Sequence, residues 1–146
     1  MMEKVLAVCI SEKKGLQKKE IPVGECLLGF GIKGDAHGGD WHRQISLLGT
    51  ESVDEMRARG LTLGNGDFAE NIVTEGIDLK ILPIGTRLAI GDEVVLEVTQ
   101  IGKECHSGCV IMKTAGKCVM PTDGIFAVVI QPGSIRAGDG IEVQYV

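Results

Sequence analysis

The feature that most constrains the fold is a series of short apolar segments separated by glycine. Residues 93–100 alternate, with Val94, Leu96 and Val98 on one side and mainly polar residues on the other. A two-residue period is typical of a half-buried strand. Residues 86–90 precede it across a Gly-Asp turn, so the two segments predict a hairpin.

The same reasoning extends along the chain. Further strands are expected at residues 4–10, 24–29, 44–48, 70–74, 125–130 and 141–145. With 21 glycines, many tight turns are available between them. Repeated helical crossovers are missing, which argues against alternating strands and helices. The pattern predicts a fold dominated by β-structure, closed or nearly closed into a β-barrel, with one or two short helices.

Helical periodicity stands out in one segment, residues 52–59. Ser52 and Glu55 match a capping box, Val53 and Met56 form a small apolar face, and Gly60 suits the end of a helix. A length of 146 residues is usual for one domain, so we expect residues 1–146 to form a single domain.

Charge and cysteine usage exclude several classes of protein. The net charge is −5 and no basic run is interleaved with aromatic residues, so a nucleic-acid partner is not expected. No apolar stretch reaches the roughly 18 residues of a membrane helix. Five cysteines, an odd number, and the lack of an export signal favour reduced thiols in the cytoplasm.

A glycine-rich segment at residues 29–43 is the first candidate for a binding site. It holds five glycines together with Lys33, His37, His42 and Arg43. Backbone N–H groups of such a loop can converge on an anion, and a lysine or arginine can complete the site. The alternative is a surface loop whose glycines serve turns and whose histidines bond the backbone.

Residues 66–72 form a second candidate. Asp67, Glu70 and Asn71 flank Phe68 just before an apolar strand. Asp67 can cap a single turn, with Glu70 three residues on, and Asn71 can satisfy backbone groups at a strand start. These structural roles compete with a role in ligand contact.

The third candidate follows the strand at 93–100 and contains Lys103, Cys105, His106 and Cys109. A cysteine is a nucleophile or metal ligand only as thiolate, a form that a neighbouring lysine and histidine favour. Cys105 and Cys109 lie within about 6 Å only if they share a helical turn. The spacing of a zinc knuckle is absent. A packed, inert thiol is the alternative for Cys105.

These motifs together resemble the MOSC domain, the C-terminal domain of molybdenum cofactor sulfurases. The resemblance rests on residues 34–37, 43–48, 67–72, 85–91 and 96–99, followed by Cys105. The chain is similar to the small stand-alone form, without an aminotransferase-like part, so pyridoxal phosphate is not expected. The sequence around the cysteine, Lys-Glu-Cys-His, departs from the Pro, Arg or Ser of many relatives, and Cys109 and Cys118 are extra.

The resemblance implies a barrel-like fold, a molybdenum or tungsten pterin cofactor, and carriage of sulfur through Cys105 as thiolate or persulfide. Cys105 is then the catalytic residue and the molybdenum ligand, with Cys109 as a second metal candidate. The expected cofactor-binding residues are Lys33, Asp35, His37, Arg43, Glu70, Asn71, Lys103 and His106. The expected partners are the cofactor, its biosynthesis or acceptor proteins, and a sulfur donor.

Two other functions stay open at this point. One is a molybdenum-dependent reductase of N- or S-oxygenated compounds, which needs a separate electron donor because the chain has no ferredoxin-type cysteine set and no flavin fingerprint. The other is a non-catalytic thiol or metal-binding module built on Cys105, His106, Cys109 and Cys118. The sequence leaves open whether the protein is an enzyme.

Overall fold

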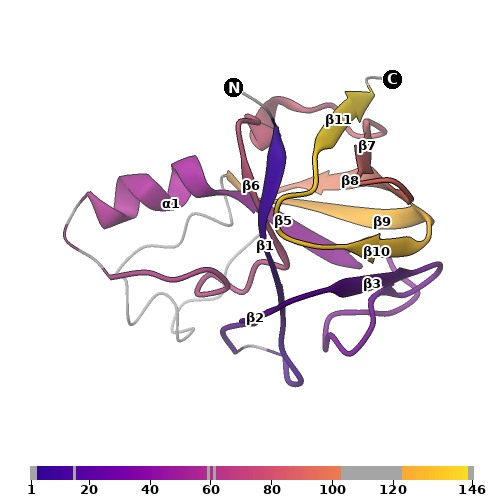
Figure 1. The fold of residues 1–146 in the computed structure, drawn as a ribbon, viewed down its shortest axis with the longest axis horizontal. Coiled ribbons are helices and arrows are strands. Elements are labelled where there is room, and N and C mark those ends of the chain that lie inside the picture. Colours follow the sequence, from indigo (N-terminus) through magenta and orange to yellow (C-terminus); the bar gives the residue numbers. More distant parts are fainter. Residues whose placement is uncertain (1–2, 15, 59, 61, 103–122, 145–146) are drawn as a thin grey trace.

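The structure is a computed structural model, and it describes residues 3–14, 16–58, 60, 62–102 and 123–144. Strands dominate the described part of the chain (Figure 1). The elements are β1 (Lys4–Ile10), β2 (Lys19–Ile21), β3 (Gly24–Leu27), β4 (Gly31–Ile32), β5 (Ile45–Gly49), α1 (Thr50–Arg57), β6 (Ile72–Glu75), the short 3₁₀ helix η1 (Leu79–Ile81), β7 (Arg87–Ile90), β8 (Val94–Ile101), β9 (Ile125–Gln131), β10 (Gly133–Ile135) and β11 (Ile141–Gln144). The predicted class, mostly β with one or two short helices, is confirmed.

Two sheets carry the fold. The larger has the order β11-β7-β8-β9-β5-β6-β1-β2, and the smaller has the order β10-β3-β4. Neighbouring strands are antiparallel except β5 and β6, which run parallel across the crossover through α1. Side chains from the two sheets meet in one apolar cluster that includes Cys26, Ile32, Leu47 and Leu96.

The large sheet does not close into a barrel. The edge strand β11 and β1, the neighbour of the other edge strand β2, approach each other at an antiparallel bridge between Lys4 of β1 and Gly140 just before β11. The N–H of Val5 also donates to the carbonyl of Asp139 at 2.8 Å. The start of β1 and the end of β11 lie on the same side of the molecule (Figure 1). The fold is therefore barrel-like in the course of its strands but stays an open sheet.

The alternation in β8 is confirmed. Val94, Leu96 and Val98 are buried, whereas Val95, Glu97 and Thr99 are partly exposed. β8 pairs with β9, and the N–H of Gly102 donates to the carbonyl of Gly124 at 2.7 Å. The two strands are thus held together up to the point where residues 103–122 connect them.

The helix begins earlier than the sequence pattern indicated. α1 spans Thr50–Arg57, its N-cap is Gly49, and no side chain caps it, so the capping role assigned to Ser52 is wrong. The reason is that β5 runs directly into the helix, with Gly49 in extended conformation. Burial of Val53 and Met56 is as predicted. No helix in the described ranges is long and apolar enough to cross a membrane.

Candidate functional site

One polar cluster lies where β5 begins and β8 ends, and we call it the Gln100 cluster. It consists of Trp41, His42, Arg43, Gln100 and Phe126. The Gln100 side-chain oxygen lies 2.8 Å from Nε2 of His42 and 3.2 Å from Nε of Arg43. Its amide nitrogen donates to the carbonyl of Gly102 at 2.8 Å. A single carboxamide therefore joins the end of the glycine-rich segment to the end of β8.

Arg43 is the cation of this cluster. Its guanidinium lies 5.3 Å from the ring centroid of Phe126 and 5.8 Å from that of Trp41, within cation–π range of both. Among the described residues it forms no ion pair with a carboxylate. A partly exposed guanidinium with this environment is suited to bind an anion from outside the chain.

Several backbone N–H groups of the glycine-rich segment are already hydrogen-bonded within the chain. The N–H groups of Phe30, Ala36, Gly38 and Gly39 donate to carbonyls of the chain, between 2.7 and 3.2 Å. A Cβ added at Gly38 would lie 2.3 Å from the Phe30 ring, so this glycine permits a close approach inside the loop. These contacts agree with the turn-forming role of the segment, and its side chains become the stronger candidates for ligand contact.

A second polar group, the Lys18 cluster, consists of Ser11, Lys18, Asp35 and His37. The Lys18 ammonium lies 2.7 Å from the Asp35 carboxylate, 3.1 Å from the Ser11 hydroxyl and 3.2 Å from Nδ1 of His37. The side chains of Lys18 and Asp35 are both fully buried. One Asp35 oxygen has no hydrogen-bond partner among the described residues.

The structure thus brings Asp35 and His37 together through Lys18, which the sequence analysis missed. Residues 13–20 contain three other lysines besides Lys18, and nothing in that local pattern marks Lys18 as the buried one. Lys33 is set apart from both clusters. It is exposed and pairs with exposed Glu25 on β3 at 3.9 Å.

Glu70 and Asn71 are both buried just before β6. Ala69, which precedes them, has a φ of 65°, in a region where residues other than glycine are uncommon. One Glu70 oxygen accepts from the N–H of Phe68 at 3.0 Å, and the other has no partner among the described residues. Burial raises the pKa of the Glu70 carboxyl from 4.5 to about 7, and Asp67 adds to this rise.

Asn71 joins three strands. Its side-chain oxygen accepts from the N–H of Ser46 at 2.9 Å, and its amide nitrogen donates to the carbonyl of Cys9 at 3.0 Å. The backbone N–H of Asn71 bonds the Ser46 hydroxyl at 3.0 Å. The predicted alternative for Asn71, satisfying backbone groups at a strand start, describes these contacts. The Asp67 carboxylate accepts from the backbone N–H of Gly64, three residues earlier in the chain, at 2.8 Å.

The predictions for Lys103, Cys105, His106, Cys109 and Cys118 fall outside the described residues. Two other thiols are described, and both are buried. Burial raises the pKa of Cys9 to about 12, with a further rise from Glu70, and burial alone raises the pKa of Cys26 to about 12. Neither thiol is therefore suited to act as a thiolate.

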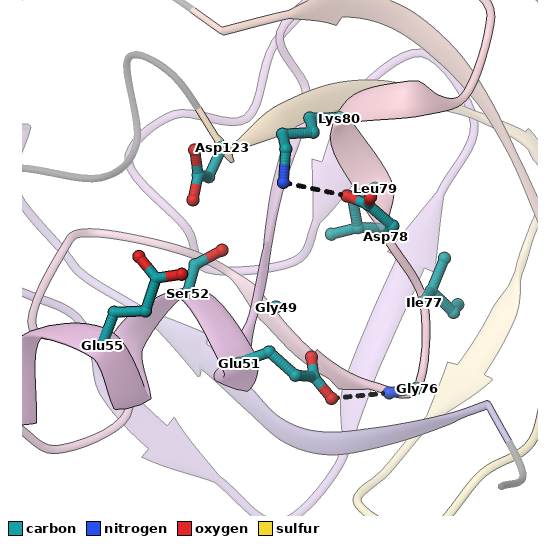
Figure 2. A pocket seen from close by; sticks show the side chains of 10 residues that line it. All are labelled: Gly49, Glu51, Ser52, Glu55, Gly76, Ile77, Asp78, Leu79, Lys80 and Asp123. Carbon is teal, nitrogen blue, oxygen red and sulfur yellow. Dashed lines mark hydrogen bonds and ion pairs between the residues drawn. The ribbon is translucent and has the colours of Figure 1, made fainter. Parts of the chain in front are cut away.

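A separate hollow of about 390 Å³ lies between the start of α1 and η1 (Figure 2). Glu51 accepts from the N–H of Gly76 at 2.9 Å, and Lys80 pairs with Asp78 at 3.2 Å. The hydrogen bond to Asp78 and its charge raise the pKa of the Lys80 ammonium. None of the predicted site residues that the structure describes lines this hollow. Within the described part of the chain, no three His, Cys, Asp or Glu side chains are placed to hold a metal ion.

Solved structures share this fold. The YuaD protein from Bacillus subtilis aligns with a TM-score of 0.83 at 24% identity, over 100% of this chain and 97% of that chain. YiiM from Geobacillus stearothermophilus aligns at 0.71 and 16% identity, over 97% of this chain and 74% of that one. YiiM from Escherichia coli aligns at 0.70 and 18% identity, over 100% and 71%. At these identities the likeness concerns the fold. No curated protein matches the sequence.

The family model for the MOSC domain matches residues 33–142. The match includes the Gln100 cluster, Asp35 and His37 of the Lys18 cluster, and the segment with Cys105. It is consistent with molybdenum-cofactor binding in general. Since it spans well over half of the sequence and agrees with the fold, the chain belongs to the MOSC domain family.

Proposed function

We propose that this protein binds a molybdenum-type pterin cofactor at the Gln100 cluster and carries sulfur on Cys105. The observation that carries the proposal is the Gln100 carboxamide, which connects Arg43 to Gly102. Cys105 follows Gly102 by three residues in the sequence. Arg43, the cation proposed to bind the anionic cofactor, is thus bonded to the end of β8, and the segment that contains Cys105 begins at the same end.

The donor set supports the cofactor. Such a cofactor has a phosphate, and Arg43 is a guanidinium whose described surroundings contain aromatic rings and no paired carboxylate. A guanidinium binds phosphate oxygens through two parallel hydrogen bonds. Soft thiolate from Cys105 is a suitable ligand for a soft metal site or for a transferred sulfur. When bound, the cofactor would supply a metal centre that a thiolate can ligate.

The Lys18 cluster has a supporting part in this proposal. Lys18 and Asp35 form a buried ion pair, and Nδ1 of His37, which is partly exposed, lies 3.2 Å from the Lys18 ammonium. This contact joins the glycine-rich segment, which contains His37, to the buried pair. Lys33, Glu70 and Asn71 remain predicted cofactor contacts, and Lys103 and His106 remain predicted neighbours of the thiol.

Sulfur carriage needs a donor and leaves the redox balance unchanged. The Cys105 thiolate attacks the outer sulfur of a donor persulfide, a new S–S bond forms on Cys105, and the donor leaves as its thiolate. An acceptor thiolate then attacks the outer sulfur of the Cys105 persulfide. The new S–S bond forms on the acceptor, and Cys105 leaves as its thiolate. No electron donor is required for either step, in contrast to the reductase alternative.

The experiment is anaerobic purification of the protein after expression in cells that make the cofactor. We expect molybdenum or tungsten and the pterin to copurify, and a mass increase of one sulfur on Cys105 after incubation with a persulfide donor. Cys105→Ser should lose the added sulfur, and Arg43→Met should lose the cofactor. Cys118→Ser is the matched control and should retain both.

Two results would contradict the proposal. If Cys105→Ser and Arg43→Met both retain the cofactor at the wild-type level, neither residue binds it. If no added sulfur appears on Cys105 of the wild type, the protein is not a sulfur carrier. One equivalent of zinc that is lost in Cys109→Ser would instead identify the chain as a thiol-based metal module. Turnover of an N-oxygenated substrate with an artificial electron donor would identify it as a reductase.

A further inference from the structure

The orientation of the Gln100 carboxamide follows from its three partners. Nε of Arg43 can only donate a hydrogen bond, and the carbonyl of Gly102 can only accept one. The carboxamide oxygen must therefore face Arg43, and its amide nitrogen must face Gly102. The reversed amide would set donor against donor and acceptor against acceptor.

This orientation determines the role of His42. Because the same oxygen lies 2.8 Å from Nε2 of His42, Nε2 must carry a hydrogen and donate it. In the neutral ring the other nitrogen, Nδ1, is then the acceptor. His42 is exposed, and Nδ1 has no hydrogen-bond partner among the described residues. Thr99 donates to the backbone carbonyl of His42, so the residue is held by its backbone as well.

We infer that Gln100 positions His42 and Arg43 as a pair that selects a protonated oxyanion, such as hydrogen phosphate. Arg43 supplies positive charge and donors to the oxygens, and Nδ1 of His42 accepts the remaining P–O–H hydrogen. Sulfate has the same shape but carries no proton at neutral pH, so it leaves Nδ1 facing a lone pair. Gln100 itself is a positioning residue that touches no ligand.

The inference deepens the proposed function, because it concerns the anionic group that Arg43 would bind. It does not depend on a metal, on the pterin or on Cys105. Its test therefore uses simple anions and the spectra of the free protein.

The first measurement follows the His42 Nε2–H and Arg43 Nε–H signals by NMR at pH 8. In the wild type we expect Nε2 of His42 to have the nitrogen-15 shift of a protonated ring nitrogen, and Nε–H of Arg43 to have the shift of a hydrogen-bonded group, since both bond Gln100. Gln100→Met, which keeps the shape but removes the acceptor, should lose both of these shifts. Gln100→Glu keeps an oxygen for both groups and should restore them, although it cannot donate to Gly102. Gln131→Met on β9 is the matched control and should leave both signals unchanged.

The second measurement titrates inorganic phosphate and sulfate at pH 8, where phosphate keeps one proton. We expect the wild type to bind phosphate about tenfold more tightly than sulfate, the scale of one hydrogen bond to a charged group. His42→Phe should abolish that preference. Gln100→Met should weaken phosphate binding about three- to tenfold, the scale for ordering side chains on binding.

The outcomes separate the two proposals. Equal affinity for phosphate and sulfate in the wild type, or His42 and Arg43 shifts that persist in Gln100→Met, would overturn the role of Gln100. If the wild type prefers phosphate to sulfate but does not bind the pterin, this inference is supported and the proposed cofactor is contradicted. A loss of these shifts in Gln100→Met that Gln100→Glu does not restore would also overturn the role of Gln100, since a general structural defect then explains the loss.

Discussion

The Lys18 cluster and the Gln100 cluster contain similar residue types in opposite environments. In the first, a lysine and an aspartate are fully buried and bonded to each other, to Ser11 and to His37. In the second, Arg43 is partly exposed, stacks near two aromatic rings and has no carboxylate partner in the described chain. The difference indicates that the first cluster chiefly maintains structure and the second is available to a ligand.

The physical reason lies in the energy of desolvation. A buried charge is stable only if the protein itself supplies its counter-charge and hydrogen bonds, so Lys18 has little capacity left for a ligand. An exposed guanidinium keeps its donors for a molecule that arrives from solvent. Substitutions should therefore act on stability in the Lys18 cluster and on binding in the Gln100 cluster.

The largest effect on stability is expected for Lys18→Met. It leaves the Asp35 carboxylate buried without its counter-charge, and removing one partner of a buried pair typically costs about 3–5 kcal/mol. Urea unfolding monitored by circular dichroism would measure this loss. Lys33→Met is the control and should change stability by less than about 1 kcal/mol, because its pair with Glu25 is exposed.

A second variant tests whether the loss comes from charge. The double change Lys18→Met with Asp35→Asn removes both charges and keeps an acceptor for the N–H of Ser11. It should regain most of the stability, because the neutral amide needs no counter-charge. If the double variant is as unstable as Lys18→Met alone, packing of the lysine stem and not electrostatics holds this region together.

Asn71→Ala should have the next largest effect. The change leaves the N–H of Ser46 and the carbonyl of Cys9 without their side-chain partner, and each buried group left unpaired costs about 1–3 kcal/mol. For the two groups together we expect a loss of about 2–6 kcal/mol in urea unfolding. Asn65→Ala, whose side chain is bonded to Glu20 at the exposed surface, should change stability by less than about 0.5 kcal/mol. Similar values for both variants would mean that Asn71 does not hold the strands together.

Glu70 should make stability depend on pH. Burial first, and Asp67 second, raise its pKa from 4.5 to about 7, so between these values the folded state binds more protons than the unfolded chain. Its contribution is therefore fully present below about pH 4.5 and falls as pH rises to about 7. The contribution is on the order of a few kcal/mol, since one unit of pKa corresponds to about 1.4 kcal/mol.

Glu70→Gln isolates that contribution. The amide keeps an oxygen for the N–H of Phe68 and does not ionise, so the variant should gain stability relative to the wild type between pH 5 and pH 8. Chemical unfolding of both proteins across this range provides the comparison. Parallel pH profiles would show that Glu70 is ionised in the folded protein throughout, or that its carboxyl has access to water.

The sequence patterns predicted regular strands far better than polar contacts. Two-residue alternation located β8, and apolar runs located β1 and β9, because these signals are local and repeated over seven or eight residues. β2, β4 and β10 were missed since two or three residues are too few to show a period. Ser52 was misread as a cap because the direct passage from β5 into α1 leaves no trace in the local pattern.

The sequence indicated which chain segments contain candidate site residues, but it did not indicate which side chains contact one another. Arg43 and Gln100 are 57 positions apart, and Lys18 and Asp35 are 17 positions apart, so each contact arises from strand pairing and not from spacing. A sequence motif can indicate that Asp35 and His37 belong to a site, but it does not indicate that the Lys18 side chain contacts both of them. Gln100 had no signal beyond its place at the end of an alternating strand.

The smallest effect on stability is expected for Arg43→Met, and this variant sharpens the contrast most. Arg43 has one hydrogen bond to Gln100 and two contacts with aromatic rings, so its removal should lower stability by about 1 kcal/mol or less. Cofactor retention measured by metal analysis should nevertheless fall more than about tenfold, because a hydrogen-bonded charge is lost. Lys18→Met, assayed at a temperature where it stays folded, should bind the cofactor with nearly wild-type affinity. The comparison fails if Arg43→Met unfolds the protein while folded Lys18→Met no longer binds the cofactor. In that case the Gln100 cluster maintains structure, and the buried Lys18 and Asp35 pair contacts the ligand.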